Sequence, residues 1–350
     1  MKISICIITK NESEKLDRCL SKLPNKDCEI VVVDTGSIDD SKAIAKKYTD
    51  AVYDYVWCDD FSKARNYAAQ MAKNDIIMMV DTDEYLEQFN IDSLFKVVKI
   101  NADKVGRICR KNDFFCNNEN FKSSEYVSRI YDRRKYEYSG RIHEQIIKKE
   151  GEGYETYIVP LTFIHDGYFE NQIMREKKSE RNLKLLFDEL DKNPEDVYIC
   201  YQIGKSYYYK KDYKKAIEYF SKTFDKEIDS RLEYVRDMIL TYGYALINMG
   251  NNKEALMLEN LYEEYSKSAD FVFLLGLIYM KNAMFKEAIV SFTCATQLTD
   301  AMVEGVNSYL ADYNIGVIYE CLGDTDTAFS YYQKCGDYNK AIVGIERIKK

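Results

Sequence analysis

Carboxylate residues gather at three places where an apolar run gives way to polar residues. Each group directly follows a short apolar segment: Asn11-Glu12 after Ile3–Ile8, Asp34 after Glu29–Val33, and Asp81–Glu84 after Ile76–Val80. Crowded carboxylates repel one another unless a cation lies between them. Mg²⁺ and Mn²⁺ prefer oxygen ligands, and they commonly bind one or two carboxylates together with phosphate oxygens. The pattern therefore favours a metal-assisted site for a phosphate-bearing ligand.

The segments between these groups predict the fold that brings them together. Over residues 1 to about 170, apolar runs alternate with helical patterns, which is typical of an α/β domain with a mostly parallel sheet covered on both faces. The expected strands are Ile3–Ile8, Glu29–Val33, Ala51–Val56 and Ile76–Val80, and the expected helices are Glu12–Leu23, Asp39–Tyr48 and Asp60–Lys73. Ligands of such sheets bind at the carboxyl ends of the strands. All three acidic groups follow expected strand ends.

Simpler roles exist for some of these residues. Thr9 or Asn11 could cap the next helix, with Glu12 in its first turn. Asp34 has no such capping role, so its carboxylate is available to a base or a ribose. Arg65 could form a surface ion pair, although its guanidinium also suits a diphosphate.

From about residue 173 the sequence predicts helices alone. Four glycines are each followed twelve residues later by an alanine: Gly204 and Ala216, Gly243 and Ala255, Gly276 and Ala288, Gly316 and Ala328. In three of the four, an aromatic residue follows the alanine by four positions: Phe220, Phe292 and Tyr332. Small residues allow close helix approach while aromatics fill the groove, and the array resembles tetratricopeptide repeats. We predict domains at 1–170 and 194–350, a linker helix at 171–193, and a capping helix at Lys340–Lys350.

Composition excludes several classes of function. The 350 residues carry a net charge of −8, which disfavours a broad nucleic-acid surface. No apolar stretch approaches the length of a membrane span, and the start lacks a secretory signal. The ten cysteines form no Cys-x-x-Cys pair, which favours the reducing cytoplasm over a zinc ribbon or a disulfide framework. The two histidines, His143 and His165, rule out a three-histidine metal site.

Four segments, taken in order, resemble family-2 glycosyltransferases of the GT-A fold: Ile7–Glu12, Val33–Asp39, Asp60–Asn66 and Val80–Glu84. The resemblance implies inverting transfer from a nucleotide-diphosphate sugar, usually a UDP-sugar, with Mn²⁺ or Mg²⁺. It also implies that Thr9, Glu12 and Asp34 line the nucleoside pocket, that Asp81 lies near the ribose, and that Asp83 binds the metal. The remaining expected contacts to the nucleotide sugar are Asn11, Ser37, Arg65, Asn66, Thr82 and His143.

The two histidines lie in segments that resemble late motifs of this family, Gly-x-Ile-His-Glu and His-x-Gly-Tyr. By this resemblance, His165 is a candidate metal ligand together with Asp83. Inverting transfer needs a base for the acceptor proton. Our first candidate is Glu144, and Asp113, Asp132 and His143 are competitors. Glu144 could instead be a surface strand residue or orient His143.

The repeats suggest what the acceptor is. Tetratricopeptide arrays bind peptides or assemble subunits through concave surfaces. The architecture resembles bacterial repeat-containing enzymes of the glycocin S-glycosyltransferase type, which implies a peptide or protein acceptor at Cys or Ser/Thr and a homodimer. One alternative is a lipid-linked or cell-surface polysaccharide acceptor, and a remoter one is a non-catalytic scaffold. Sugar choice is expected to depend on loops such as Asn112–Ser124.

Overall fold

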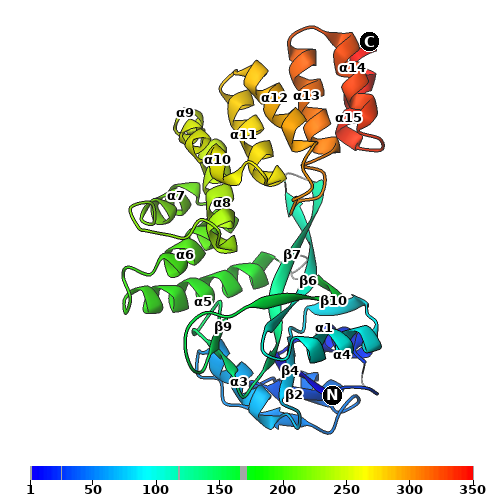
Figure 1. Cartoon of the computed structure of the whole chain (residues 1–350), viewed down its shortest axis with the longest axis vertical. Helices are drawn as coiled ribbons and strands as arrows, with labels where there is room; N and C mark the ends of the chain where they lie inside the picture. The colour runs from blue at the N-terminus through cyan, green and yellow to red at the C-terminus, as the bar shows by residue number, and fades with distance from the viewer. Residues whose placement is uncertain (1, 25, 117–118, 166–171, 350) are drawn as a thin grey trace. The chain divides into compact units, whose positions relative to one another are not determined.

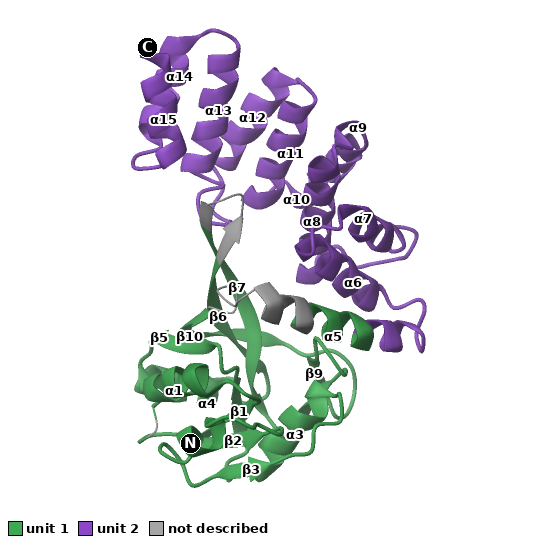
Figure 2. Ribbon diagram, turned by 180° about the vertical axis from the view of Figure 1, so that it is seen from behind, with its two compact units in different colours: residues 1–185 green, residues 186–350 purple. Residues whose placement is uncertain are grey.

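The computed structural model describes residues 2–24, 26–116, 119–165 and 172–349. It divides into two compact units, Met1–Leu185 and Leu186–Lys350 (Figure 2). The division falls within helix α5 (Gln172–Leu190), in the segment for which the sequence predicts a linker helix. Residue 171, the first of that predicted segment, lies outside the described residues.

The first unit is built on an eight-stranded sheet with the order β3-β2-β1-β4-β7-β6-β10-β5. The strands are β1 (Ile3–Thr9), β2 (Glu29–Asp34), β3 (Val52–Asp54), β4 (Ile76–Val80), β5 (Glu84–Gln88), β6 (Val105–Cys116), β7 (Glu119–Asp132) and β10 (Thr156–His165). Strands β3, β2, β1 and β4 run parallel to one another, and β10 is parallel to β6. The pairs β4–β7, β6–β7 and β10–β5 are antiparallel. The GT-A-type α/β fold that the sequence predicts is confirmed.

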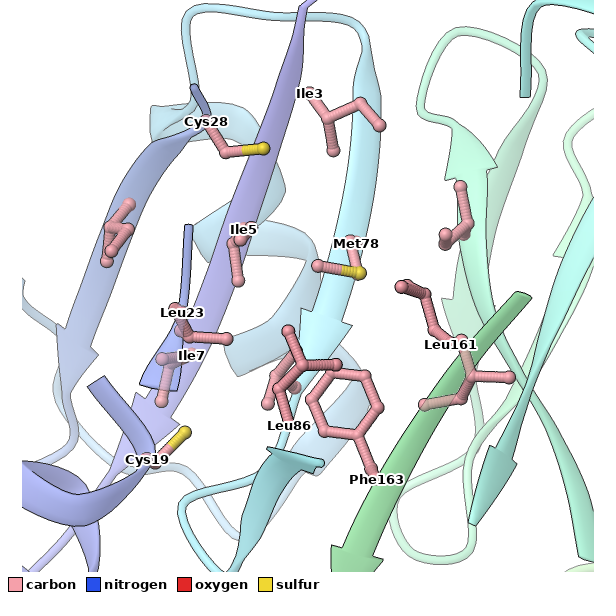
Figure 3. Packing of buried hydrophobic residues seen from close by; sticks show 14 of the residues in the cluster. Ile3, Ile5, Ile7, Cys19, Leu23, Cys28, Met78, Leu86, Leu161 and Phe163 are labelled. Atoms are coloured by element: carbon pink, nitrogen blue, oxygen red, sulfur yellow. The ribbon is translucent and has the colours of Figure 1, made fainter. Parts of the chain in front are cut away.

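Alternation along the central strands explains why both faces of the sheet are covered. Ile3, Ile5 and Ile7 of β1 enter one core with helices α1 (Ser13–Lys22), α2 (Ser41–Ala45) and α4 (Ile91–Ile100), as Figure 3 shows in part. Cys6 faces a second core with helix α3 (Phe61–Met71) and the small sheet of β8 (Tyr136–Ser139) and β9 (Gln145–Lys148). Because side chains alternate between faces, an apolar strand supplies both cores.

Two parts of the first unit differ from the sequence prediction. Helix α2 and strand β3 are shorter than the expected Asp39–Tyr48 and Ala51–Val56. The described residues of Asn112–Ser124, expected as a loop, belong to the antiparallel strands β6 and β7. The charged residues that flank this segment form ion pairs with other strands, Arg110 with Glu84 and Glu125, and Lys111 with Glu87.

The second unit is an array of helical hairpins (Figure 1). Its helices are α6 (Val197–Tyr209), α7 (Tyr213–Ser221), α8 (Glu233–Met249), α9 (Asn252–Ala255), α10 (Tyr262–Tyr265), α11 (Ala269–Lys281), α12 (Phe285–Ala295), α13 (Tyr309–Cys321), α14 (Thr325–Lys334) and α15 (Asn339–Ile348). A 3₁₀ segment, Leu256–Leu261, joins α9 to α10. The all-helical repeat fold is confirmed.

The repeated glycines provide contact points for the aromatic side chains. A Cβ added to Gly276 would meet the Phe292 ring at 2.6 Å, and one added to Gly204 would meet the Phe220 ring at the same distance. Gly243, whose repeat lacks the aromatic residue, faces Leu258 and Leu274 instead. The second helix of that repeat is broken into α9, the 3₁₀ segment and α10. None of the described helices of the chain is long and apolar enough to cross a membrane.

Candidate active site

The three polar groups meet at one edge of the sheet, as their positions after β1, β2 and β4 predict. Thr9 pairs with Asp34 in the parallel register of β1 and β2, and Ile7 pairs with Val80 on β4. Hydrogen bonds then join the loops beyond the strands, because the Thr82 hydroxyl donates to Glu12 Oε2. The carboxyl ends of three neighbouring strands therefore form one candidate site.

Asp34 closes a turn with one oxygen and leaves the other facing inward. Its Oδ1 accepts the backbone N–H groups of Gly36 at 2.9 Å and Ser37 at 2.8 Å, in a turn that Gly36 enters at φ +103°. Asp34 Oδ2 and Thr9 Oγ1 are buried and have no hydrogen-bond partner among the described residues. Buried polar atoms of native proteins are normally paired, so these two atoms are candidate contacts for a polar ligand.

Asn11 and Ser37 connect the first two loops. Asn11 donates its backbone N–H to Ser37 Oγ at 2.9 Å, and its side-chain oxygen accepts the N–H of Ile38 at 2.8 Å. Asn11 has a φ of +53°, in the left-handed region that asparagine tolerates better than most residues. Both side chains are thus engaged in shaping the edge of the site.

Two buried arginines, Arg65 and Arg129, bind the carboxylate of Asp81. Its Oδ1 lies 2.7 Å from Arg65 Nη2, and its Oδ2 lies 2.5 Å from Arg129 Nη2. Burial raises the pKa of Asp81, but the charges and hydrogen bonds of Arg129 and Arg65 lower it well below its usual value overall. Arg129 also contacts Glu84 at 2.6 Å, and the side chain of Glu84 is completely buried. Asp81 is therefore a fixed carboxylate within a charge network.

The candidate base belongs to the same network. Arg65 Nε donates to Glu144 Oε1, so one guanidinium joins Glu144 to Asp81. The segment before Glu144 is fastened to α3, because Phe61 donates its N–H to the Arg141 carbonyl at 2.9 Å. His143 precedes Glu144 with a φ of +50°. The fold therefore brings Arg65 and Glu144 into contact. The sequence motifs did not indicate this contact.

Asn66, a predicted nucleotide-sugar contact, bonds to the backbone of β8. Its Nδ2 donates to the Tyr138 carbonyl at 2.8 Å, and its Oδ1 accepts the Tyr138 N–H at 2.9 Å. The Asn66 amide thus bonds both backbone polar groups of Tyr138, as a neighbouring strand would, and it connects β8 to α3. Both ends of the Asn66 amide are engaged by the backbone of Tyr138, and its contact with a nucleotide sugar stays a prediction.

Of the competing bases, Asp132 lies at the wrong end of the sheet. It pairs with Ile76, at the start of β4, whereas Asp81 follows the end of that strand. Its carboxylate binds Arg134 at 2.6 Å. The alternative base assignment to Asp132 is therefore wrong. Asp113 follows Asn112 on β6, so the two side chains point to opposite faces.

Asp83 and His165 approach each other at the same edge as Asp81. His165 ends β10 opposite Glu84 of β5, and its Nε2 lies 3.6 Å from Asp83 Oδ2. Burial raises the pKa of Asp83, whereas the hydrogen bond and charge of His165 lower it, so that the net shift is downward. Bonds of about 2.1 Å from one ion to each atom fit this separation.

Without a substrate, Asp83 and His165 supply only some of the ligands that Mn²⁺ or Mg²⁺ needs. Among the described residues, no group of three or more His, Cys, Asp and Glu side chains could hold a metal ion. A pair of protein ligands fits a cation that takes further oxygens from a diphosphate. Imidazole nitrogen makes Mn²⁺ the better match of the two.

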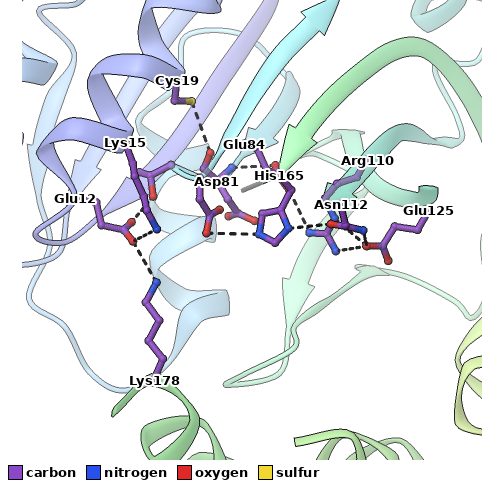
Figure 4. A network of polar contacts seen from close by, with 12 residues as sticks. Glu12, Lys15, Cys19, Asp81, Glu84, Arg110, Asn112, Glu125, His165 and Lys178 are labelled. Atoms are coloured by element: carbon purple, nitrogen blue, oxygen red, sulfur yellow. Dashed lines mark hydrogen bonds and ion pairs between the residues drawn. The ribbon is translucent and has the colours of Figure 1, made fainter. Parts of the chain in front are cut away.

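Residues that the sequence analysis did not single out complete the site. Lys178 of α5 lies 3.3 Å from Glu12 Oε1, and Figure 4 shows it beside Lys15. Arg110, Asn112 and Glu125 extend the network from Glu84 toward His165 (Figure 4). The period-two alternation of β6 and β7 was the available signal, because it places every second charged side chain on one face.

Comparison with known proteins agrees with this geometry. Residues 4–158 match the model of glycosyl transferase family 2, and residues 197–223 and 313–342 match tetratricopeptide repeats. The SPbeta prophage-derived glycosyltransferase SunS of Bacillus subtilis is 26% identical over 321 residues, covering 87% of this chain and 73% of SunS. An uncharacterized glycosyltransferase of Rickettsia conorii is 37% identical over 87 residues, which cover 25% of this chain and 30% of that protein.

A solved structure resembles the repeats. The tetratricopeptide protein YrrB, described as having an unusual peptide-binding site, shares 21% identity with a TM-score of 0.42, covering 51% of this chain and 86% of YrrB. The match to the family-2 model and the similarity to SunS together show a glycosyltransferase. Residues 4–158 match family 2, matches to tetratricopeptide repeats follow, and the chain resembles SunS over 87% of its length.

Proposed function

We propose that the chain transfers a sugar, with inversion, from a UDP-sugar to a Cys or Ser/Thr side chain of a peptide or protein in the presence of Mn²⁺ or Mg²⁺. The observation that carries this proposal is the approach of Asp83 and His165, 3.6 Å apart, beside Asp81 at the carboxyl edge of the sheet. A divalent ion held there would supply positive charge for the departing diphosphate.

The nucleoside is assigned to the part of the site beside Asp34. A uracil ring carries an N–H donor, which suits the buried and unpaired Asp34 Oδ2. The Thr9 hydroxyl is a second polar group there, and it can donate or accept. Glu12 and Thr82 are bonded to each other and would orient the neighbouring ribose. These contacts support a uridine nucleotide as the donor.

Glu144 is assigned as the base that receives the acceptor proton. Arg65 holds its Oε1, which fixes the carboxylate and leaves Oε2 as the atom to take the proton. Asp113 and His143 are the other candidates. The base stands within the Arg65–Asp81 network, so the proton-accepting group and the donor-binding residues are positioned by a single guanidinium.

The repeats are assigned to acceptor recruitment. Tetratricopeptide arrays recognise chains in extended or helical form, and a soluble peptide needs such a surface more than a sugar acceptor does. The proposal includes a cytoplasmic location, supported by the free thiols of the cysteines in the described segments, and a homodimer. The same catalytic chemistry on a lipid-linked or polysaccharide acceptor is the competing outcome.

The decisive experiment measures transfer by intact mass. The full-length protein is incubated with Mn²⁺, a panel of UDP-sugars, and peptides encoded near its gene, beside undecaprenyl-phosphate-linked acceptors. We expect a hexose-sized mass increase on a peptide, its loss in Asp83→Asn, and its retention in Asp27→Asn, an exposed control. Transfer to the lipid-linked acceptor alone would contradict the peptide assignment, and absence of thermal stabilisation by every uridine nucleotide would contradict the donor.

A further inference from the structure

The His165 imidazole lies at the end of a hydrogen-bonded chain that crosses three neighbouring strands. Its Nδ1 lies 2.9 Å from Oδ1 of Asn112 on β6. Asn112 Nδ2 in turn donates to Oε1 of Glu125 on β7 at 2.6 Å. Arg110 donates to the same Glu125 oxygen through Nη2 at 2.9 Å (Figure 4). The strand register enforces this order, because Asn112 is opposite His165 and Arg110 is opposite Glu125.

The donor and acceptor chemistry of the described contacts orients this chain. A carboxylate that is paired with a guanidinium accepts hydrogen bonds, so Asn112 must turn its NH₂ group toward Glu125. The carbonyl oxygen of Asn112 then faces His165. Because a carbonyl oxygen accepts only, the hydrogen in this contact must be carried by His165 Nδ1. In the neutral ring the lone pair is then on Nε2, the atom that faces Asp83.

We propose that Asn112, oriented by Glu125, is a positioning residue that holds His165 as the Nδ1–H tautomer and presents Nε2 as the metal-binding atom. Asn112 is 5% exposed, which limits replacement of its amide by water. Groups that orient a ligating imidazole in this way typically change metal affinity 10- to 100-fold when they are removed. The metal part of this inference rests on the proposed function, whereas the tautomer part is independent of it.

The two-histidine composition makes the tautomer directly measurable. In the full-length protein labelled with ¹⁵N-histidine, the metal-free spectrum contains two imidazoles, and His143→Gln identifies which belongs to His165. At a pH where both rings are neutral, we expect the His165 proton on Nδ1. Asn112→Leu should shift the ring toward Nε2–H, the form that free histidine favours. Asn112→Asp should restore Nδ1–H, because its carboxylate still accepts from that atom.

The second measurement is Mn²⁺ affinity in the presence of UDP, followed by the electron paramagnetic resonance of free Mn²⁺. We expect Asn112→Leu to bind 10- to 100-fold more weakly and Asn112→Asp to stay within a few-fold of wild type. A purely structural role would lower the melting temperature of both variants without changing the tautomer. Asn112→Ser, whose hydroxyl is too short to reach His165, replaces the leucine variant if that one fails to fold.

The outcomes separate this inference from the proposed function. A wild-type His165 with its proton on Nε2, or an Asn112→Leu variant that keeps both the wild-type tautomer and Mn²⁺ affinity, overturns the positioning role. A tautomer shift with unchanged Mn²⁺ affinity also overturns it as a metal-directed role. If the wild-type protein binds no Mn²⁺ with UDP, the metal assignment of the proposed function fails, and the tautomer of wild type and Asn112→Leu still decides whether Asn112 positions the ring.

Discussion

Arg129, near the end of β7, places its Nη2 2.5 Å from Oδ2 of Asp81, which directly follows β4. The two residues are 48 positions apart in sequence, and the antiparallel pairing of β4 with β7 brings them together. Arg129 is 7% exposed and also binds Glu84, so one buried guanidinium contacts both the partly exposed Asp81 and the buried Glu84. The site therefore depends on the fold for its charge balance.

Removal of Arg129 should be strongly destabilising. Arg129→Met leaves Asp81 and Glu84 with less compensation in a buried environment, for which we expect a loss of about 3–5 kcal/mol in the free energy of unfolding. Lys104→Met is the control, because Lys104 and its partner Glu155 are both exposed and the change should cost less than about 1 kcal/mol. Urea denaturation followed by circular dichroism measures both. Equal losses in the two variants would contradict the role of Arg129.

Asp34→Asn should weaken nucleotide binding without unfolding the protein. The asparagine oxygen can still close the turn with Gly36 and Ser37, but an NH₂ group replaces the inward-facing Oδ2. An acceptor becomes a donor, so we expect UDP affinity with Mn²⁺ to fall at least about tenfold. Calorimetry compares this variant with Asp40→Asn at an exposed position. An unchanged affinity would place the uracil elsewhere.

Glu144→Gln should separate catalysis from binding. The amide oxygen can still accept from Arg65, but an amide cannot take a proton from the acceptor. We expect kcat to fall about 100-fold or more while UDP affinity stays within a few-fold of wild type. Single-turnover transfer assays with saturating donor measure this effect. Near-normal turnover would show that His143 or Asp113 is the base.

Gly276→Ala should destabilise the repeats, although alanine usually favours a helix. The added Cβ would meet the Phe292 ring at 2.6 Å, and overpacking of a core typically costs about 1–3 kcal/mol. Phe292→Leu removes the opposing ring and should recover part of that loss in the double variant. Thermal unfolding of both single variants and the double variant forms the required cycle. Additive losses would mean that the two positions are not in contact.

Glu320 should contribute a pH-dependent part of the stability of the repeats. The hydrogen bond from Arg347 lowers the pKa of Glu320, and Tyr332 donates to the same carboxylate at 2.6 Å. An acid whose pKa is lowered on folding stabilises above its unfolded pKa of about 4.3, and this stabilisation is lost as the pH falls. The difference between wild type and Glu320→Gln, measured in urea, should therefore be larger at pH 7 than at pH 3.5. A difference that grows in acid would contradict the sign.

Local sequence patterns were sufficient for the parallel half of the first unit and for the repeats. Continuous apolar runs located β1, β2 and β4, and the positions after these strands located Asp34, Asp81 and Asp83. The glycine spacing located the hairpins, because three of the four glycines lie against an aromatic ring of the following helix and Gly243 lies against leucines. In the repeats, the glycine and the aromatic ring that it contacts belong to the same helical hairpin, so a local sequence pattern indicates their contact.

The antiparallel half could not be read in the same way. The roles of Arg129, Asn112 and Glu125 depend on partners in other strands. Those partners are set by the strand register, which the sequence of one charged strand does not predict. Asp132 illustrates the reverse error. Its carboxylate looked available, but the direction of β7 carries it to the end of β4 opposite the site.

The interrupted second repeat has a consequence for how the solenoid holds together. In a linear array, each repeat is stabilised chiefly by the neighbours that flank it, so cooperativity passes from hairpin to hairpin. Where α9 and α10 replace a full helix, we expect the coupling between neighbouring repeats to be weakest. The α6–α7 hairpin on one side and the hairpins from α11 onward on the other are thereby less tightly coupled than members of a uniform array. The repeat unit should accordingly unfold as two cooperative blocks that are separated at residues 252–265. The boundary between the blocks follows from the aromatic residue that the second repeat lacks.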